Sequence, residues 1–407
     1  PTTRSLVVVL LALQLALFWY DNMVGNRCQA EQLHDLALPQ RCLEQLSRQF
    51  QTLREQALKQ LREMGYDVRY LESEECCPYL RVYSREPAEF TGWGLVINDR
   101  RDKFYPMEQF TSSLRCLPEL RYLQVRNDEC WDDSLGELIV EACPEVRWLS
   151  LPVIGLKTAK QLTTLKSLQV MEIRGHSSED KISDELLHYI ARIPNLRVLC
   201  IGTVQGNLTL KGLRELTKAP RLEVFAMGLD DRYKPTYRGP GVPPDPPKPD
   251  PIVPDRVFHE MADILAAMPR LRSLCLTIQH GFDSRMDDRF VAKLSKSRTI
   301  RRLCFSSGKH RRITDESAGY LAQMQQLEVL GIVYSGISDE GVKHLATLPN
   351  LRELYLYGAI GITDRSVPTF CQMKNLIFLN VKETGMSKAG WTAVMEHVRK
   401  NRERSQQ

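Results

Sequence analysis

Ten short segments of the chain repeat one pattern, L-x-x-L-x-L, with other apolar residues at some of the leucine positions. Their first residues are 26, 22, 28, 26, 49, 29, 27, 24 and 25 positions apart. A six-residue strand with two or three apolar anchors cannot bury its own face, so stacked units must share one core. The pattern therefore predicts an elongated repeat array across most of the 407 residues. The segments are LRYLQV at Leu120, VRWLSL at Val146, LQVMEI at Leu168, LRVLCI at Leu196, LEVFAM at Leu222, LRSLCL at Leu271, IRRLCF at Ile300, LEVLGI at Leu327, LRELYL at Leu351 and LIFLNV at Leu376.

A helical pattern lies between successive strand segments. In residues 337–346, ISDEGVKHLA, either Ser338 or Asp339 is suited to cap a helix, because a short side-chain oxygen can accept the first free backbone N–H groups. Val342 and Leu345 then fall on the face that turns toward the strands. Each unit is thus predicted to contain one strand and one helix.

The stretches ISDEGVKHLATLPNLRELYL and ITDRSVPTFCQMKNLIFLNV resemble the cysteine-containing and bacterial-type subclasses of the leucine-rich-repeat family. The resemblance extends over about 290 residues. It implies an α/β leucine-rich-repeat solenoid, a horseshoe with parallel strands on the concave face and helices on the convex face. It implies a binding surface but no particular partner. The asparagine of the family motif is mostly replaced, and the resemblance leaves the loop geometry open there; the corresponding residues are Arg126, Pro152, Arg174 and Gly202.

The ends of a repeat array need covers, because the outermost units would otherwise expose the shared core. Residues 39–64 have the spacing of an amphipathic helix, and residues 94–97 are a short strand-like run, so both are expected in an N-terminal cap. On the final helix, Trp391, Val394, Met395 and Val398 are expected to seal the other end. The predicted domains are a membrane anchor or uncleaved signal at residues 1–24, the cap at residues 25–115 and the repeat domain at residues 116–407.

The N-terminal stretch Leu6–Tyr20 reads LVVVLLALQLALFWY and is apolar except for Gln14. It is short for a membrane span, which takes about 20 residues, and its length favours a signal peptide. The bulky residues at its end and the lack of a small-residue cleavage site favour a retained anchor instead. We therefore expect residues 5–20 to enter a membrane as a single pass, with the repeat domain on the side opposite the N-terminus. The alternative is a secreted or periplasmic protein.

The single long spacing locates an insertion of proline-rich sequence at residues 230–256. Proline fixes the backbone and favours extended conformations, so this segment cannot belong to the repeat core. It is either an arm that grips a partner or a stiff surface loop, and the sequence does not distinguish the two.

Side chains alternate along a strand, so the third, fifth and seventh positions of each unit point out of the concave surface. Aromatic residues lie toward both ends of this predicted surface, as in many partner interfaces. Either the surface binds a partner, or the cap or the insertion folds over it. The residues predicted to bind a protein partner are Tyr122, Gln124, Trp148, Glu172, Arg174, Arg302, Glu353, Tyr355, Tyr357 and Phe378.

The sequence contains no pattern of catalytic residues. The eight histidines are scattered over different units, and no G-x-S-x-G or phosphate-loop motif is present. Eleven cysteines lack zinc or disulfide spacing, and Cys275 and Cys304, expected side by side on neighbouring strands, are interpreted as packing residues. With 55 basic and 50 acidic residues interleaved, a nucleic-acid partner is not indicated. We therefore predict no enzymatic activity, cofactor, metal or small-molecule substrate.

Together these features predict a non-catalytic protein-interaction scaffold that needs no cofactor, is tethered to a membrane and serves as an accessory subunit of a larger membrane assembly. The alternative of a secreted or periplasmic recognition protein requires cleavage after the apolar run. A third reading is an F-box-like substrate adaptor, because Leu38-Pro39 is followed by Leu43, Leu46 and Phe50.

Overall fold

The computed structural model divides into two compact units. Unit 1 comprises Pro1–Cys76, Pro87–Met171 and Ile193–Asn195, and unit 2 comprises Cys77–Glu86, Glu172–Arg192 and Leu196–Gln407. The residues that the structure describes are 40–63, 67–71, 92–97, 107–117, 120–125, 133–152, 154–173, 182–204, 209–229, 255–278, 286–306 and 311–405.

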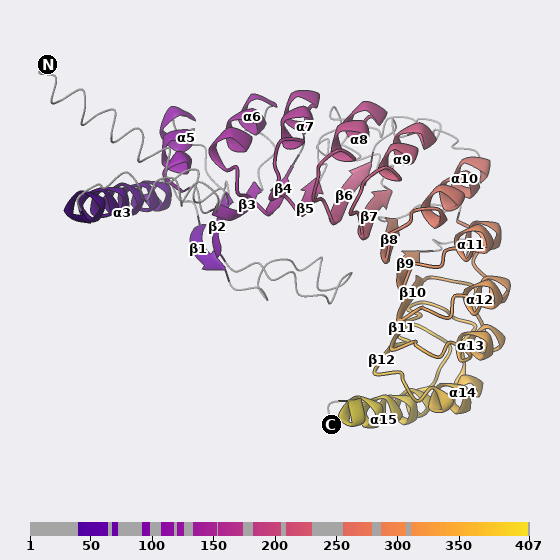
Figure 1. Ribbon diagram of the computed structural model, residues 1–407. Helices are drawn as coiled ribbons and strands as arrows, with labels where there is room; N and C mark the ends of the chain where they lie inside the picture. Colours follow the sequence, from indigo (N-terminus) through magenta and orange to yellow (C-terminus); the bar gives the residue numbers. More distant parts are fainter. Residues whose placement is uncertain are drawn as a thin grey trace, which may run out of the picture. The chain divides into compact units, whose positions relative to one another are not determined.

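The first described element of unit 1 is a long helix, which is followed by strands that alternate with helices (Figure 1). Strand β1 pairs with β2 in an antiparallel sense, whereas β2 with β3 and β3 with β4 are parallel pairs. The predicted helix at residues 39–64 is present as α3, and the strand-like run at residues 94–97 lies within β2. The elements are α3 Gln40–Glu63, β1 Asp67–Leu71, β2 Gly92–Ile97, α5 Met107–Arg115, β3 Leu120–Val125, α6 Asp133–Ala142, β4 Trp148–Leu151 and α7 Leu156–Leu162; β5 Val170–Ile173 crosses into unit 2.

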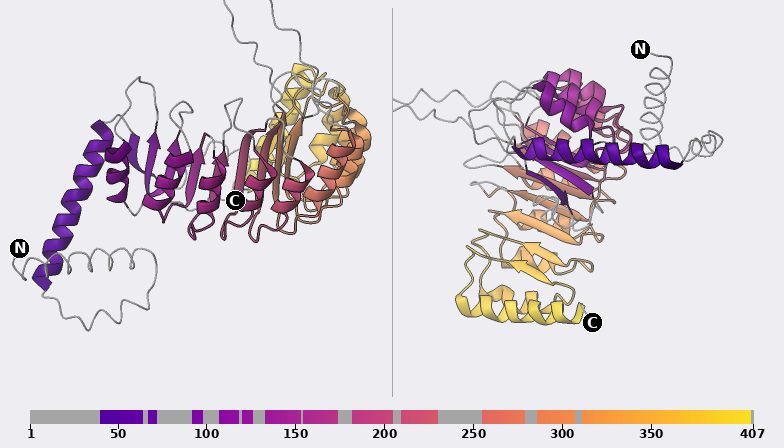
Figure 2. Two further views of the ribbon diagram at one scale, coloured as in Figure 1. Left: turned by 90° about the horizontal axis from the view of Figure 1, so that it is seen from above. Right: turned by 90° about the vertical axis from the view of Figure 1, so that its left-hand side faces the viewer.

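Unit 2 is built from parallel strands that are neighbours in chain order, each followed by a helix on the same side of the sheet (Figures 1 and 2). This arrangement confirms the predicted repeat of one strand and one helix. Its strands are β6 Val198–Val204, β7 Val224–Leu229, β8 Ser273–Ile278, β9 Arg302–Ser306, β10 Val329–Val333, β11 Glu353–Tyr355 and β12 Phe378–Asn380. Its helices are α8 Asp184–Ile190, α9 Leu210–Leu216, α10 Asp255–Ala266, α11 Asp288–Leu294, α12 Asp315–Leu321, α13 Asp339–Leu345, the 3-10 turn η1 Asp364–Ser366 with α14 Val367–Gln372, and α15 Lys388–Ser405.

The core of unit 2 lies between the strand layer and the helix layer. The fourth position of each strand segment supplies a fully buried side chain, as in Leu303 and Leu330, and the helices contribute Val342 and Leu345, as predicted. Complete burial of such a side chain stabilises the fold by roughly 2 kcal/mol. Because every repeat contributes to both sides of this layer, the core continues from one repeat to the next.

A row of aspartates joins the helix N-termini of successive repeats, and we call it the Asp ladder. The hydroxyl of Ser338 accepts the Glu340 N–H of its own helix, so Ser338 is the N-cap of α13. Asp339, the next residue, bonds to the following repeat: its carboxylate accepts the Thr363 N–H at 2.8 Å, the Thr363 hydroxyl at 2.6 Å and the Ser366 hydroxyl. The two candidate caps of the sequence pattern therefore have different roles.

The same arrangement recurs along unit 2. In each step a carboxylate on the first residue of one helix accepts the backbone N–H of the next N-cap residue, and in most steps it also accepts that residue's hydroxyl. The repeats at α8 and α9, and those from α11 to α15, are therefore linked by charge-assisted hydrogen bonds in addition to the strand ladder. The steps are Asp184 to Thr209, Asp288 to Thr314, Asp315 to Ser338, Asp339 to Thr363 and Asp364 to Ser387.

Helix α15 packs over the last repeat. Val394 and Val398 are buried, as predicted, and the Asn401 amide donates to the carbonyl oxygens of Met373 and Leu376 at 3.1 and 3.0 Å. The expectation for Trp391 was wrong, because its side chain lies off the buried stripe of Val394 and Val398 and is 39% exposed.

Several sequence predictions fall outside the described residues. They include the membrane segment at residues 5–20, and all of the proline-rich insertion except Asp255 and Arg256, which begin α10. Within the part of the chain that is described, no helix combines the length and the apolar character needed to cross a bilayer.

Candidate functional site

The strand face of unit 2 carries the columns of side chains expected from the repeat. At the third position, Arg302, Val329, Glu353 and Phe378 are successive register partners on β9 to β12. At the fifth position, Cys304, Gly331, Tyr355 and Asn380 are aligned in the same way. Because parallel strands lie about 4.8 Å apart, neighbouring side chains cover one another on this face. Val329 and Glu353 are accordingly buried, whereas Tyr355 and Phe378 keep part of their surface accessible.

The predicted residues at the end of this face form one cluster. The rings of Tyr355 and Phe378 lie 4.8 Å apart at an interplanar angle of 32°. The Tyr355 hydroxyl donates to the Glu353 carboxylate at 3.0 Å, and Glu353 is only 5% exposed. Such ring pairs present apolar area with few rotatable bonds, which lowers the entropy lost when a partner binds. The cluster is suited to contact a partner through its rings.

A second group of side chains continues from this cluster along the loops that follow the strands. The Tyr334 and Tyr357 rings meet edge to face at 5.3 Å, and the Tyr334 N–H donates to the Tyr357 carbonyl at 2.8 Å. The Tyr357 hydroxyl donates to the Glu383 carboxylate, which raises the pKa of Tyr357 and keeps it protonated; the hydrogen bond with Tyr334 adds to the same effect. We call Arg311, Tyr334, Tyr357 and Glu383 the loop strip. It connects four successive repeats.

The backbone of the loop strip adopts an unusual conformation. Arg311, Tyr334 and Glu383 have φ values of 50°, 55° and 56°, in the left-handed region that non-glycine residues rarely occupy. Each costs roughly 1 kcal/mol, so the surrounding contacts must stabilise them. One such contact is the Arg311 guanidinium, which donates to the carbonyl oxygens of Ser335 at 2.9 Å and of Gly358, one and two repeats further along. Backbone strain of this kind occurs often at binding sites.

Sequence reasoning found Tyr357 but missed Arg311, Tyr334 and Glu383. They lie between strand and helix, beyond the columns that strand alternation defines. A signal was present in the glycines Gly336, Gly361 and Gly385, each two residues before an N-cap in three consecutive repeats. A side chain at Gly336 or Gly385 would place its Cβ 2.7 Å from the carbonyl oxygen of the preceding repeat. These glycines therefore mark loops that lie directly against one another.

Three predicted site residues lie in unit 1. Tyr122 and Trp148 are register partners on β3 and β4, and their rings meet edge to face at 4.6 Å. Trp148 is only 1% exposed, so in this structure its contacts are with its neighbours in the fold. Gln124, next to Ser150 on β4, is half-buried.

The remaining predicted residues are dispersed. Glu172 on β5 is 7% exposed, Arg302 begins β9, and Arg174 lies outside the described residues. The structure thus gathers Glu353, Tyr355, Tyr357 and Phe378 from the predicted set, together with the missed residues of the loop strip.

Two of the cysteines lie side by side on the strand face of unit 2. Cys275 and Cys304 are register partners on β8 and β9, and the two sulfurs are not joined by a disulfide bond. Burial raises the pKa of Cys304 to about 12, so its thiolate is scarcely populated at neutral pH. Among the described residues no group of three or more histidine, cysteine, aspartate or glutamate side chains is placed to hold a metal ion.

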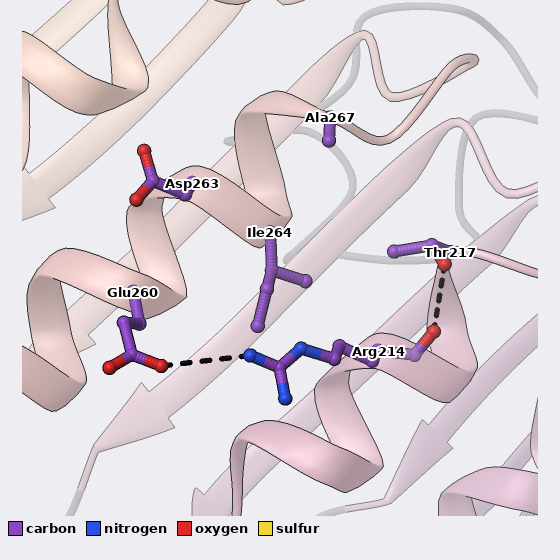
Figure 3. Close-up of a pocket in the computed structure, with 6 residues that line it drawn as sticks. All are labelled: Arg214, Thr217, Glu260, Asp263, Ile264 and Ala267. Carbon is purple, nitrogen blue, oxygen red and sulfur yellow. Dashed lines mark hydrogen bonds and ion pairs between the residues drawn. The ribbon is translucent and has the colours of Figure 1, made fainter.

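A groove on the helix layer lies between α9 and α10 and has a volume of about 360 Å³ (Figure 3). Arg214 and Glu260 face each other across it at 3.6 Å, and the Thr217 hydroxyl donates to the Arg214 carbonyl. Asp263, also on its wall, pairs with Lys293. Each charged side chain that lines this groove is therefore already in an ion pair, so we expect the groove to have little preference for a charged ligand.

No protein-family model matches the chain, and no curated protein matches it. Several solved structures match weakly. An internalin (inlF) from Listeria monocytogenes is 14% identical, with a TM-score of 0.38, over 78% of this chain and 91% of that one. A chain of the yeast Rad7 and Elc1 complex is 13% identical (TM-score 0.42; 91% and 84% covered), and a chain of the TLR13–ssRNA13 complex is 15% identical (0.35; 66% and 40%). The architecture of parallel strands alternating with helices therefore rests on the chain's own repeat and strand pairing.

Proposed function

We propose that the chain is a non-catalytic scaffold that binds a protein partner through β10 to β12 and the loop strip. The observation that carries the proposal is the gathering of four aromatic rings from three successive repeats, Tyr334, Tyr355, Tyr357 and Phe378. Partner interfaces are enriched in aromatic anchors of this kind, surrounded by polar groups.

The exposed carboxylate of Glu383, at one end of the loop strip, favours a partner that presents a basic side chain there. Glu383 is exposed and already accepts the Tyr357 hydroxyl, and Tyr334 is 40% exposed. An arginine or lysine placed over a tyrosine face gains a cation–π attraction of about 0.5–2 kcal/mol, and a nearby carboxylate adds to it. The proposed contact is therefore an aromatic surface with an acidic edge.

We expect the double variant Tyr334→Ala/Tyr357→Ala to bind the partner about tenfold more weakly or worse, because two central rings are removed. The partner is first identified by copurification with the full chain from native membranes in mild detergent, and its affinity is then measured by calorimetry. Tyr320→Ala is the matched control, since Tyr320 on α12 also donates to a glutamate, Glu316, but on the helix layer. Equal affinities of the double variant, the control and the wild type would contradict the proposed site. Circular dichroism verifies that each variant is folded.

The second part of the proposal is a membrane tether at residues 5–20, with the repeat units on the side opposite the N-terminus. Its support is the apolar run Leu6–Tyr20, which ends in Phe18, Trp19 and Tyr20, residues that favour the membrane boundary. We expect the full-length chain to remain in the membrane pellet after a carbonate wash, and a variant with Leu10→Arg and Leu13→Arg to leave it. Release of the intact wild-type chain would contradict the tether. A mature N-terminus beginning after about residue 20 would instead identify a secreted or periplasmic recognition protein.

A further inference from the structure

A cavity of about 350 Å³ lies where α15 meets the last two repeats, at the edge of the sheet where the strands begin. Its walls come from three separate parts of unit 2. Arg352 directly precedes β11, Lys374 and Ile377 lie between α14 and β12, and Arg404 and Ser405 end α15.

The position of α15 is fixed by hydrogen bonds at this cavity. Asn401 is 4% exposed and donates to two backbone carbonyls of the turn that follows α14. One residue further along the helix, the Arg402 guanidinium donates through Nε and Nη2 to the Ile377 carbonyl at 3.2 and 3.1 Å. These contacts hold the last turn of α15, and with it Arg404, beside Lys374 and Arg352.

The cavity carries positive charge without a balancing carboxylate. None of the described residues that line it is acidic, and Arg352, Lys374 and Arg404 form no ion pair with any described carboxylate. Two acids next to these cations are already paired: Glu328, whose carbonyl accepts the Arg352 N–H, binds Arg301 at 2.9 Å, and Glu403, which precedes Arg404 in the chain, binds Arg399 at 3.4 Å. Cations at a helix C-terminus are favourable, which accounts for Arg404, but Arg352 and Lys374 belong to other elements.

The groove between α9 and α10 provides a contrast within the same unit. It has almost the same volume, but its arginine and its acids are paired with partners on or beside its walls. Like charges that converge repel one another unless an anion is bound between them. The charge imbalance therefore distinguishes the cavity at α15 as the one that selects for a ligand.

We propose that this cavity binds a phosphate group. A phosphate presents several acceptor oxygens and up to two negative charges, which match the two guanidinium groups and the one ammonium group better than a single carboxylate would. The site is independent of the proposed partner surface on the strand face, because none of its lining residues belongs to that surface.

The test is calorimetric titration of the full chain with inorganic phosphate in a low-salt chloride buffer. We expect saturable binding that becomes about tenfold weaker or worse in Lys374→Gln/Arg404→Gln, because two charge-assisted contacts are lost. The matched control is Arg399→Gln/Lys400→Gln, which also removes two positive charges from the chain, but at residues of α15 that pair with Glu403 and Glu396 and do not line the cavity. The control is expected to bind as the wild type does. Thermal unfolding without phosphate verifies that both double variants are folded.

Titration with O-phosphoserine separates two sources of the phosphate group. Tighter binding of O-phosphoserine than of inorganic phosphate indicates a phosphorylated side chain, and the reverse order indicates the free ion. Equal weakening in both double variants would show that only the net charge of the chain matters, and it would overturn the proposal. The absence of saturable binding to the wild type by either compound would do the same.

Discussion

Asp339→Ala is expected to lower the free energy of unfolding by about 2–4 kcal/mol, because it removes a carboxylate that joins two repeats. Asp339 accepts hydrogen bonds from the Thr363 N–H, the Thr363 hydroxyl and the Ser366 hydroxyl. Ser366 is only 1% exposed, so its hydroxyl cannot readily turn to water after the substitution. The change is measured by urea denaturation at neutral pH.

Glu340→Ala is the control for this substitution. Glu340 is the next residue and is mostly exposed, and its side chain pairs, among the residues that the structure describes, only with Lys343 on its own helix. Its loss is therefore expected to change the free energy of unfolding by less than about 0.5 kcal/mol. Similar effects of the two substitutions would contradict the role assigned to the Asp ladder.

The charge of Asp339 also gives this stabilisation a pH dependence. Burial alone would raise the pKa of Asp339, but the hydrogen bonds from Ser366 and Thr363 outweigh it and hold the pKa below its ordinary value of 3.8. The stabilisation is therefore complete above that value and is lost as the pH falls through the lower pKa of the folded state. The difference between the wild type and Asp339→Ala should accordingly shrink in strongly acidic solution.

Two glycine-to-alanine substitutions in neighbouring helices are expected to have opposite effects. At Gly341 in α13, an added Cβ would lie 2.3 Å from the Asp315 Oδ1 atom and 2.8 Å from the Ile337 Cγ2 atom. The Asp315 carboxylate is held by the N–H and the hydroxyl of Ser338, so it cannot move without losing both bonds. We expect Gly341→Ala to destabilise the protein by about 2–4 kcal/mol.

At Gly319 in α12 an added Cβ meets nothing within 4 Å. Alanine is the better helix former, so Gly319→Ala should stabilise the protein by about 0.5–1 kcal/mol. Thermal unfolding of the two variants beside the wild type shows the sign of each change. If both variants shifted the unfolding temperature in the same direction, the close approach of the Asp315 carboxylate would not be what requires glycine at position 341.

Much of the architecture could be predicted because apolar periodicity determines it. Two or three apolar anchors per strand specify which side faces the helices, and the register of β9 to β12 aligns the residues in the expected columns. Residues 337–346 form a helix with Val342 and Leu345 buried for the same reason. These features depend on spacing, which a single sequence shows directly.

The accessible surface was harder to predict, since it depends on neighbours from other repeats. Alternation places Trp148 on the strand face but does not show that Tyr122 packs against it. The loop strip was missed because Arg311, Tyr334 and Glu383 adopt a left-handed backbone conformation that their side chains do not favour. The cavity at α15 depends on the position of that helix, which the hydrogen bonds of Asn401 fix. The repeat pattern of the sequence does not predict those bonds.

The Asp ladder has a direction, and its last step explains where it stops. Ser387 donates its N–H to Asp364, but the next residue is Lys388, whose ammonium group cannot accept a hydrogen bond from a further unit. Before that point, the pairs Thr314-Asp315 and Ser338-Asp339 each make both kinds of contact. The first residue donates its N–H to the aspartate of the preceding repeat, and the aspartate accepts an N–H from the following repeat. A further repeat with the same pair of residues could therefore be inserted between α12 and α13 and linked by the same hydrogen bonds. Extending the array beyond α15 would first require an acidic residue in place of Lys388.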